Sequence, residues 1–300
     1  MRGAFLLERL ATSVVVMVVV ALLTFALIDF SPGSYVDELA SNPQISAETL
    51  ARMRVQYGLD RPFYQKFWQW ARSAASGDFG YSFVYQRPIR QLVAERLWNT
   101  VSLNLTALAV AWTVGLALGW ISAATAGSIV DWAIGAFAAA LLAIPVVVAA
   151  ILLLAGAVRL GLPLQTLFLP ATAVAAVWLP AIARHSRSAV VQALGAPHML
   201  AARARGVSRT RLLMVHAARE ALTPLTGLIG ISVAALLSAS LPVEVVMSWP
   251  GIGQLTYDAV LKRDIFLVVD LVQLSALLLL VGNTIGDVLL RVVDPRVGGA

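Results

Sequence analysis

The sequence predicts an all-α membrane protein with six transmembrane helices, on three observations. First, 59% of its 300 residues are hydrophobic and only 13% are charged, against roughly 45–50% and 25% in an average soluble domain. Second, the apolar residues gather in uncharged runs of about 20, the length that a helix needs to cross a bilayer. Third, arginines cluster near the ends of these runs, as in the loops of membrane proteins. An ordinary soluble enzyme is therefore disfavoured.

Charge and cysteine content narrow the classes further. The formal net charge is +6, but lysine occurs only at Lys66 and Lys262, and the other basic residues are arginines. Their position beside apolar runs indicates membrane orientation rather than binding to nucleic acid. The chain has no cysteine, which excludes disulfides, thiolate metal sites and cysteine nucleophiles.

Each long uncharged run is interpreted as a helix, because lipid offers no partner to backbone polar groups. For the first run a signal peptide is the alternative. The residues after it, Asp29 to Pro32, do not form a small-residue cleavage site, so we expect the run to stay as an anchor. The six predicted spans are Leu10–Ile28, Thr100–Ala124, Trp132–Val158, Gln165–Ala183, Ala221–Val243 and Ile265–Leu290.

Two spans carry features that are unusual in lipid. Pro163, Pro170 and Pro180 punctuate the run Leu160 to Ala183, and they predict a kink in the fourth span. The sixth span includes Asp270 and Asp287 near its edges. An acid at mid-helix opposes insertion by about 2.5–3.5 kcal/mol, and by less near the interface.

Six spans put both termini on one side of the membrane, and the arginines indicate which side. The link between the fourth and fifth spans, about residues 184–220, carries seven arginines and one acid, Glu220. Short cytoplasmic loops collect arginines, so this link and both termini are predicted to be cytoplasmic. Residues 31–96 then lie outside despite their eight basic residues, because charge stops governing translocation above about 60 residues. The predicted parts are 1–30 with the first span, the extracytoplasmic segment 31–96, and a core of five spans over 97–300.

The segment 31–96 is predicted to form short helices, because its aromatic content is too high for a solvated tail. Turn signals divide it at Gly58-Leu59-Asp60-Arg61-Pro62 and Gly77-Asp78-Phe79-Gly80. Two interpretations stay open: the aromatic residues form a docking surface for an external partner, or they lie at the membrane interface or in a small local core. These residues are Tyr57, Phe63, Tyr64, Phe67, Trp68, Trp70, Phe79, Tyr81, Phe83 and Tyr85.

The cytoplasmic link is predicted to present a short helix. Pro197 suits the first position of a helix, the alanines, Leu200 and arginines that follow favour helix, and Gly206 can take the left-handed conformation that ends it. A second helix is expected after Ser208. One polar stripe on it comprises Arg209, His216, Glu220 and Thr223.

Two interpretations of the short helix also stay open. Its alanines allow close approach by a partner, and Arg203 and Arg205 can pair with acids on that partner. Alternatively, the link is a basic juxtamembrane loop that only orients the protein and touches anionic lipid.

The chain lacks the residues for nucleotide or metal chemistry. No Gly-Lys-Ser/Thr triplet occurs, and His185, His198 and His216 lack the His-Glu-x-x-His spacing. Energy for uphill transport would therefore come from another chain. Glu244 and Asp270 are candidate residues of a solute path, because ionisable groups inside spans usually face an interior or a water-filled cavity. For Glu244, near a helix end, a place at the interface is equally compatible.

The stretch Leu200-Ala201-Ala202-Arg203-Ala204-Arg205-Gly206, with Pro224 after it, resembles the Glu-Ala-Ala-x-x-x-Gly loop of the permease subunits of binding-protein-dependent ABC importers. The variant here is similar to that of the dipeptide, oligopeptide and nickel group. Further matches extend over nearly the whole chain. They are Gly58 to Pro62, Gly77 to Gly80 with Ser82-Phe83, Glu95-Arg96, Glu244, Ser248-Trp249-Pro250-Gly251-Ile252-Gly253, Arg263-Asp264 and Asp294-Pro295-Arg296.

The resemblance implies the type I permease fold of ABC importers and a function as half of the pathway for a dipeptide, an oligopeptide or a related solute such as a nickel complex. It implies a non-catalytic subunit of the cell inner membrane without a cofactor, since ATP and Mg would be bound by partner ATPase subunits. The implied partners are a second homologous permease, two ATP-binding subunits, a periplasmic or lipid-anchored binding protein and membrane lipid, with no nucleic acid. The implied ATPase-coupling residues are Pro197, His198, Leu200, Ala201, Ala202, Arg203, Arg205 and Gly206.

The chain departs from the group's pattern at a few positions. Pro197-His198 stand where Asp-Tyr is frequent, Leu200 replaces the acid of the motif, and Asp270 replaces a small residue. The link Arg159 to Pro163 is shorter than usual.

Two other classes of protein are alternatives to this interpretation. One is a stand-alone secondary transporter driven by ions through Asp270 and Glu244, and the other is a membrane scaffold without transport.

Overall fold

The computed structural model describes residues 2–30, 36, 40, 46–56, 58 and 60–293. Within these residues every regular element is a helix, apart from one isolated β-bridge between Tyr81 and Pro88, so the all-α prediction is confirmed there. The predicted motif Asp294-Pro295-Arg296, and Tyr57 and Leu59, lie outside the described residues. The elements are α1 (Arg2–Phe30), α3 (Ala47–Gln56), α4 (Phe63–Ala75), α5 (Ile89–Ala124), α6 (Ile129–Ala143), α7 (Val146–Arg159), α8 (Phe168–Leu194), α9 (Pro197–Ala204), α10 (Arg209–Arg211), the π-helix η1 (Leu212–Ala217), α11 (Ala218–Val246), α12 (Ile252–Leu261) and α13 (Ile265–Val293).

The number of candidate membrane spans agrees with the prediction. Among the described residues, five continuous helical stretches are long and apolar enough to cross a membrane, and a sixth span results if the bent pair α6 and α7 counts as one. The five are Leu7–Ile28, Ile89–Ala124, Phe168–Leu194, Arg209–Val246 and Ile265–Val288.

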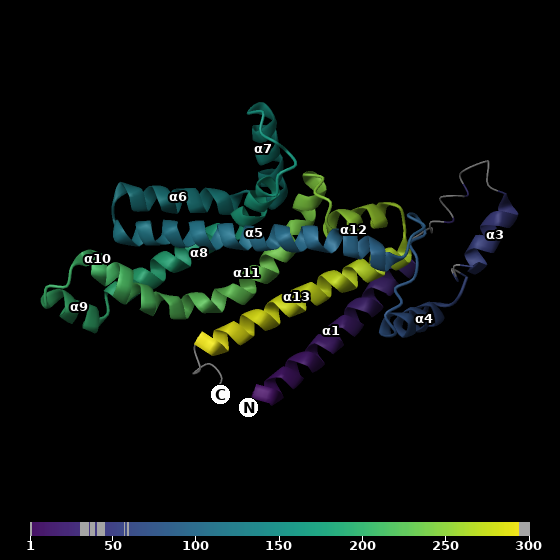
Figure 1. The fold of residues 1–300 in the computed structure, drawn as a ribbon, viewed down its shortest axis with the longest axis horizontal. Helices are drawn as coiled ribbons and strands as arrows, with labels where there is room; N and C mark the ends of the chain where they lie inside the picture. Colours follow the sequence, from purple (N-terminus) through teal and green to yellow (C-terminus); the bar gives the residue numbers. More distant parts are fainter. Residues whose placement is uncertain are drawn as a thin grey trace. The chain divides into compact units, whose positions relative to one another are not determined.

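The third predicted span is not one helix. Helices α6 and α7 are bent by 106° at a short break, and Figure 1 shows α7 turning away from α6. Pro145 lacks an N–H and disfavours helical geometry in the residue before it, and Ile144 is extended, with φ −93° and ψ 118°. The expectation of a continuous helix over Trp132–Val158 is therefore wrong, because it rests on hydropathy and ignores this proline.

The helices on either side of α9 extend into the predicted cytoplasmic link. Helix α8 contains Pro180 and continues to Leu194, so Arg184 and Arg187 are helical. On the other side, the helix predicted after Ser208 begins at Arg209 and continues into α11, so this prediction is confirmed. The non-helical part of the link is thus confined to short connections before and after α9.

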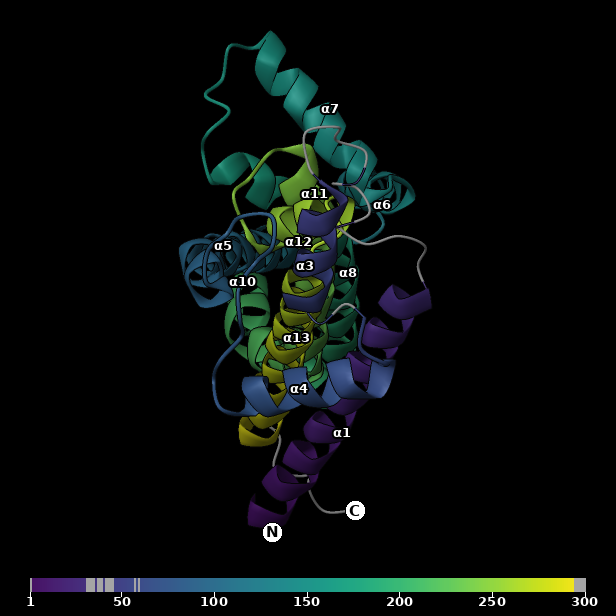
Figure 2. The same ribbon diagram turned by 90° about the vertical axis from the view of Figure 1, so that its right-hand side faces the viewer.

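The chain divides into two compact units, residues 1–100 with 250–280 and residues 101–249 with 281–300. In the first unit, α4 crosses α1 (Figure 2). Phe25 of α1 contacts Phe67 and Trp70 of α4, with ring centroids 5.7 and 5.3 Å apart. A second buried cluster joins the first turns of α5 to α12 and α13. It consists of Ile89, Leu92, Ile252, Leu255, Ala259, Leu267 and Leu271.

In the second unit, α8 is the helix that the others share, since it packs against α6, α7, α9, η1 and α11. Glycine permits α5 to approach α8 closely. A Cβ atom on Gly119 would lie 2.5 Å from the carbonyl oxygen of Ala183 and 2.6 Å from Cβ of Ser186, distances that no side chain tolerates. The core of this unit therefore depends on small residues at the helix contacts.

Candidate functional site

The short helix α9 begins as the sequence predicts. Pro197 occupies its first turn, and Ala196 before it is extended, with φ −66° and ψ 144°. The carbonyl of Ala196 accepts hydrogen bonds from the N–H groups of Met199 and Leu200, at 3.0 and 3.2 Å. Proline costs nothing at this position because its missing N–H would have no partner inside the helix.

The helix ends in a Schellman motif built on Gly206. Gly206 has φ +83°, its N–H donates to the carbonyl of Arg203 at 3.0 Å, and the N–H of Val207 donates to that of Ala202 at 3.2 Å. This pair of bonds defines the motif and needs a left-handed residue, for which glycine has no steric penalty. Both ends of α9 are thus fixed by residues of its own sequence.

One face of α9 is buried and the other is exposed. Met199 and Ala202 are 3% and 7% exposed and belong to a cluster with Ala189 and Ala193 of α8, Leu212 and Ala217 of η1 and Ala221 of α11. The remaining predicted coupling residues are exposed. The outer face of α9 comprises Pro197, His198, Leu200, Ala201 and Arg203, together with Arg205 directly after the helix. Ala202 is therefore a packing residue, although the sequence grouped it with the contact residues.

A side-chain contact ties α9 to α11. Nε2 of His198 lies 3.0 Å from Oε2 of Glu220, and both side chains are largely exposed. Glu220 belongs to the predicted polar stripe, so part of that stripe faces α9. Exposed pairs of this kind contribute little free energy, so the apolar cluster rather than this contact holds the helix in place.

The helix that leads into α9 is anchored by an ion pair. Nε and Nη2 of Arg187 in α8 donate to Oδ1 and Oδ2 of Asp131 in α6, each at 2.7 Å. Asp131 is buried and also accepts hydrogen bonds from Ser122 and from the N–H of Gly127, the latter at 2.9 Å. The bidentate geometry and the additional donors are what a buried carboxylate requires.

The helix that leaves α9 is anchored near the same turn. Nη2 of Arg209 donates to the carbonyl of Ala124, the last residue of α5, at 2.6 Å. Arg187, before α9 in the sequence, and Arg209, after it, therefore both contact the α5–α6 turn, residues 125–128, or the residues that flank this turn. Neither contact follows from the sequence analysis, which counted Arg187 as a charge of the cytoplasmic link and placed Arg209 on a polar stripe of the following helix.

The two predicted path residues fall in different units. Glu244 in α11 is fully buried. Asp270 in α13 is 6% exposed, and its Oδ1 accepts a hydrogen bond of 2.8 Å from Nε1 of Trp70. Its Oδ2 is buried and accepts no hydrogen bond from the described residues. Within the same residues, no group of three His, Asp or Glu side chains is placed to hold a metal ion.

Comparisons with known proteins agree with this architecture. Residues 115–299 match the family described as binding-protein-dependent transport system inner membrane component, and residues 2–104 match the family of its N-terminal part. The chain is 30% identical to the oligopeptide transport system permease protein AppB of Bacillus subtilis (strain 168), over 98% of this chain and 99% of that protein. It is 31% identical to the glutathione transport system permease protein GsiC of Escherichia coli (strain K12), over 98% of each. Identity to a putative peptide transport system permease protein of Brucella melitensis biotype 1 is 32%, over 99% of each.

The fold also has a counterpart among solved structures. A chain of the MetNI methionine ABC transporter in an inward-facing conformation superposes with a TM-score of 0.59 at 20% identity, covering 68% of this chain and 97% of that chain. The chain belongs to the family of binding-protein-dependent transport system inner membrane components. It is thus a non-catalytic, multi-pass permease subunit of an inner-membrane ABC importer, and the ATP is bound by a partner ATPase.

Proposed function

We propose that this permease forms half of the translocation pathway for a short peptide or a related solute, completed by a second, homologous permease subunit. The observation that carries the proposal is similarity over the full length of relatives whose names specify oligopeptide, glutathione and peptide transport. Two ATP-binding subunits supply the energy, and a periplasmic or lipid-anchored binding protein delivers the solute.

We further propose that α9 is the coupling helix that docks on an ATPase subunit. Its outer face supplies Leu200 as an apolar contact and Arg203 and Arg205 as partners for acidic groups. Its buried face links it to α8, η1 and α11, so a displacement of α9 moves these helices as well. A loop that served only to orient the protein on anionic lipid would not need Met199 and Ala202 packed into a core.

The proposed topology places both termini and α9 in the cytoplasm and residues 31–96 outside. It is supported by the seven arginines of residues 184–220, since short cytoplasmic loops collect basic residues. Two of these arginines, Arg187 and Arg209, make structural contacts near the α5–α6 turn. The exposed arginines of α9 remain available to bind the ATPase.

We also propose that Glu244 and Asp270 border the solute path. Both are buried, and the unpartnered Oδ2 of Asp270 is the kind of group that a passing solute or water satisfies. Glu244→Gln and Asp270→Asn should change the KM for solute uptake while the ATPase still co-purifies. An unchanged KM in both variants would remove these residues from the path.

Reconstitution in liposomes tests the function. The permease pair, its ATPase subunits and its binding protein should take up a labelled dipeptide or oligopeptide only when ATP is present. Uptake by this chain alone, without an ATPase, would instead establish a secondary transporter, and absence of any solute uptake would favour a scaffold.

A matched pair of double variants tests the role of α9. The variant Leu200→Asp with Arg203→Glu reverses charge on its outer face and should reduce co-purification of the ATPase at least about tenfold, as for loss of an apolar anchor and an ion pair. The control Leu160→Asp with Arg159→Glu makes the same changes at the exposed end of α7 and should leave co-purification intact. Equal effects of the two variants would contradict the docking role.

A further inference from the structure

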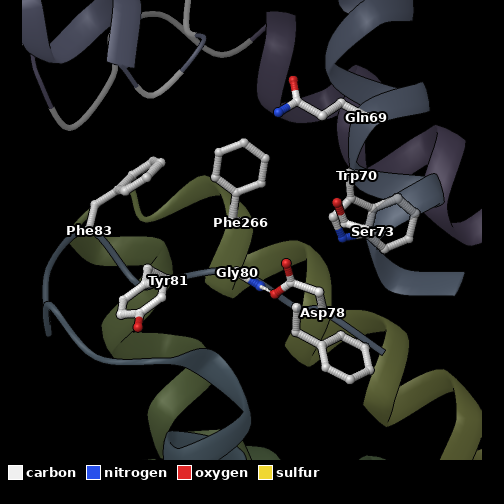
Figure 3. Close-up of a pocket in the computed structure, with 9 residues that line it drawn as sticks. Gln69, Trp70, Ser73, Asp78, Gly80, Tyr81, Phe83 and Phe266 are labelled. Atoms are coloured by element: carbon white, nitrogen blue, oxygen red, sulfur yellow. Dashed lines mark hydrogen bonds between the residues drawn. The ribbon is translucent and has the colours of Figure 1, made fainter. Parts of the chain in front are cut away.

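The first unit contains a pocket that the coupling mechanism does not use. It is a half-open cavity of about 310 Å³, lined by residues of α4, of the loop 76–88 and of the first turn of α13. Figure 3 shows Gln69, Trp70 and Ser73 on one side of it, Tyr81 and Phe83 on the other, and Phe266 between Phe83 and Trp70. A cavity of this size accommodates a small organic group but not a folded segment of another protein.

The walls of the pocket are mostly aromatic. Five of its nine lining residues are Trp70, Phe79, Tyr81, Phe83 and Phe266. Phe83 is buried and packs edge-on against Phe266, with ring centroids 5.3 Å apart. Phe79 and Tyr81 are 41% and 64% exposed, so their rings are open to a ligand. Aromatic faces carry a negative quadrupole that attracts cations.

The pocket also contains a negatively charged side chain, which attracts cations as the aromatic faces do. Asp78 is the one acidic or basic residue among the nine that line it. Its Oδ1 accepts the N–H of Gly80 at 3.0 Å, which fixes the carboxylate at the pocket (Figure 3). Within the described residues Asp78 makes no ion pair, so its charge is available to a ligand. A carboxylate beside several aromatic faces is the arrangement that recognises organic ammonium groups.

One wall is held rigidly. The indole of Trp70 donates to the buried carboxyl group of Asp270 at 2.8 Å and packs against Phe25 and Phe67. The ring cannot rotate away without breaking this bond. The pocket is therefore preorganised on this side, which lowers the entropy cost of binding.

We propose that this pocket binds an organic ammonium group. Two sources share this chemistry: the N-terminal ammonium of a peptide and the side chain of a lysine residue in a peptide. Binding of an ammonium group can be measured on this chain alone. Only the assignment of the ammonium group to a peptide rests on the proposed function. It assigns to the segment 31–96 a ligand contact that a purely structural aromatic core would lack.

Binding is measured on the full-length permease in lipid nanodiscs, without ATPase, with tetramethylammonium as the probe. Its methyl protons should shift upfield in the NMR spectrum as they enter the aromatic walls, and the shift should saturate. Asp78→Asn keeps the acceptor for Gly80 but removes the charge, and it should weaken binding about fivefold. Tyr81→Leu should weaken it about threefold, whereas Tyr81→Phe retains the ring and should stay within about twofold.

Two control variants change the same residue types outside the pocket. Asp60→Asn and Tyr64→Leu alter exposed residues that do not line it, and both should bind like the wild type. Thermal melting of each variant shows that it is folded. Absence of saturable binding by the wild type, or equal binding by Asp78→Asn, Tyr81→Leu and the controls, would overturn the proposal.

Three small ligands separate the two sources. Trialanine offers an N-terminal ammonium, N-acetyl-lysine amide offers only a side-chain ammonium, and N-acetyl-trialanine amide offers neither. Binding of the first or the second that depends on Asp78 identifies the source and supports the proposal, whereas equal binding of the third contradicts it. Peptide uptake by the complete importer is measured separately, so a pocket that fails this test leaves the transport function standing.

Discussion

The hydroxyl of Ser82 donates a 2.5 Å hydrogen bond to Oδ2 of Asp264, 182 residues further along the chain, and both side chains are buried. The same oxygen accepts the N–H of Val84 at 3.1 Å, and Oδ1 accepts the N–H of Leu267 at 3.4 Å. Asp264 directly precedes α13, so its carboxylate caps this helix and holds the loop that precedes α5. The two sequence motifs Ser82-Phe83 and Arg263-Asp264 thus meet in one clamp.

Loss of the serine hydroxyl should weaken this clamp. Ser82→Ala leaves the buried carboxyl group with one donor fewer and should lower the free energy of unfolding by about 1–3 kcal/mol, measured by denaturant unfolding of the permease in detergent. The hydroxyl of Ser76 donates to the carbonyl of Ser73 at an exposed position, and Ser76→Ala should change the free energy of unfolding by less than about 0.5 kcal/mol. Similar losses in both variants would contradict a buried clamp.

The folded protein should also become less stable as pH rises, because Asp264 is buried. Burial raises the pKa of Asp264 above its ordinary value, although the hydrogen bonds from Ser82 and Val84 oppose this. The folded protein then binds the proton more tightly than the unfolded chain. This contribution to the free energy of unfolding is fully present below the unfolded pKa, about 3.9, and is lost as pH rises through the raised folded pKa.

Comparison with Asp264→Asn isolates this contribution, because the asparagine does not titrate. The free energy of unfolding of the wild type should fall relative to that of the variant as pH is raised from about 4. Denaturant titrations at a series of pH values measure the difference. A difference that is constant over this range would show that Asp264 has the same pKa in both states.

The ion pair between Arg187 and Asp131 should behave as one coupled unit. Arg187→Ala and Asp131→Ala should each lower the free energy of unfolding by about 1–3 kcal/mol, less than for a fully buried pair because the arginine is partly exposed. The double variant should lose less than the sum of the two. Arg184→Ala, at an exposed position of the same helix, is the control and should have little effect. Strictly additive losses would argue against the pair.

The end of α9 should tolerate few residues at position 206. Gly206→Val forces a β-branched residue into the left-handed region at φ +83° and should cost about 1 kcal/mol or more, whereas Gly206→Asn should be milder. In the reconstituted importer, the valine variant should take up less peptide per ATP hydrolysed, with normal amounts of permease in the membrane. Wild-type uptake by this variant would contradict the need for a fixed helix end.

The structure of α9 could be predicted from sequence because its determinants are local. Pro197 and Gly206 act within one or two residues of the helix ends, so the helix bounds follow from the order of residues alone. The buried face is different. Met199 and Ala202 become core residues only because η1 and α8 pack against them, and the sequence pattern of a single short helix does not reveal which side is covered.

The missed contacts are those between distant residues. Arg187 and Asp131 lie 56 residues apart in the sequence. The residues around Arg187 have a composition typical of a cytoplasmic loop, so the sequence did not suggest an ion pair. One signal was present: an acid beside an otherwise apolar run needs a partner, and Asp131 stands directly before the run that begins at Trp132. In the same way, Pro145 is a local sequence feature that indicates the bend between α6 and α7.

The most direct test of the account is whether the outer face of α9 touches an ATPase subunit. The chain has no cysteine, so each engineered cysteine is unique. In membranes that contain the complete importer, Leu200→Cys and Arg203→Cys should form adducts with the ATPase through a short bifunctional crosslinker. Met199→Cys on the buried face and Leu160→Cys at the exposed end of α7 should not. An ATPase adduct from Leu160→Cys with none from Leu200→Cys or Arg203→Cys would contradict the docking of α9.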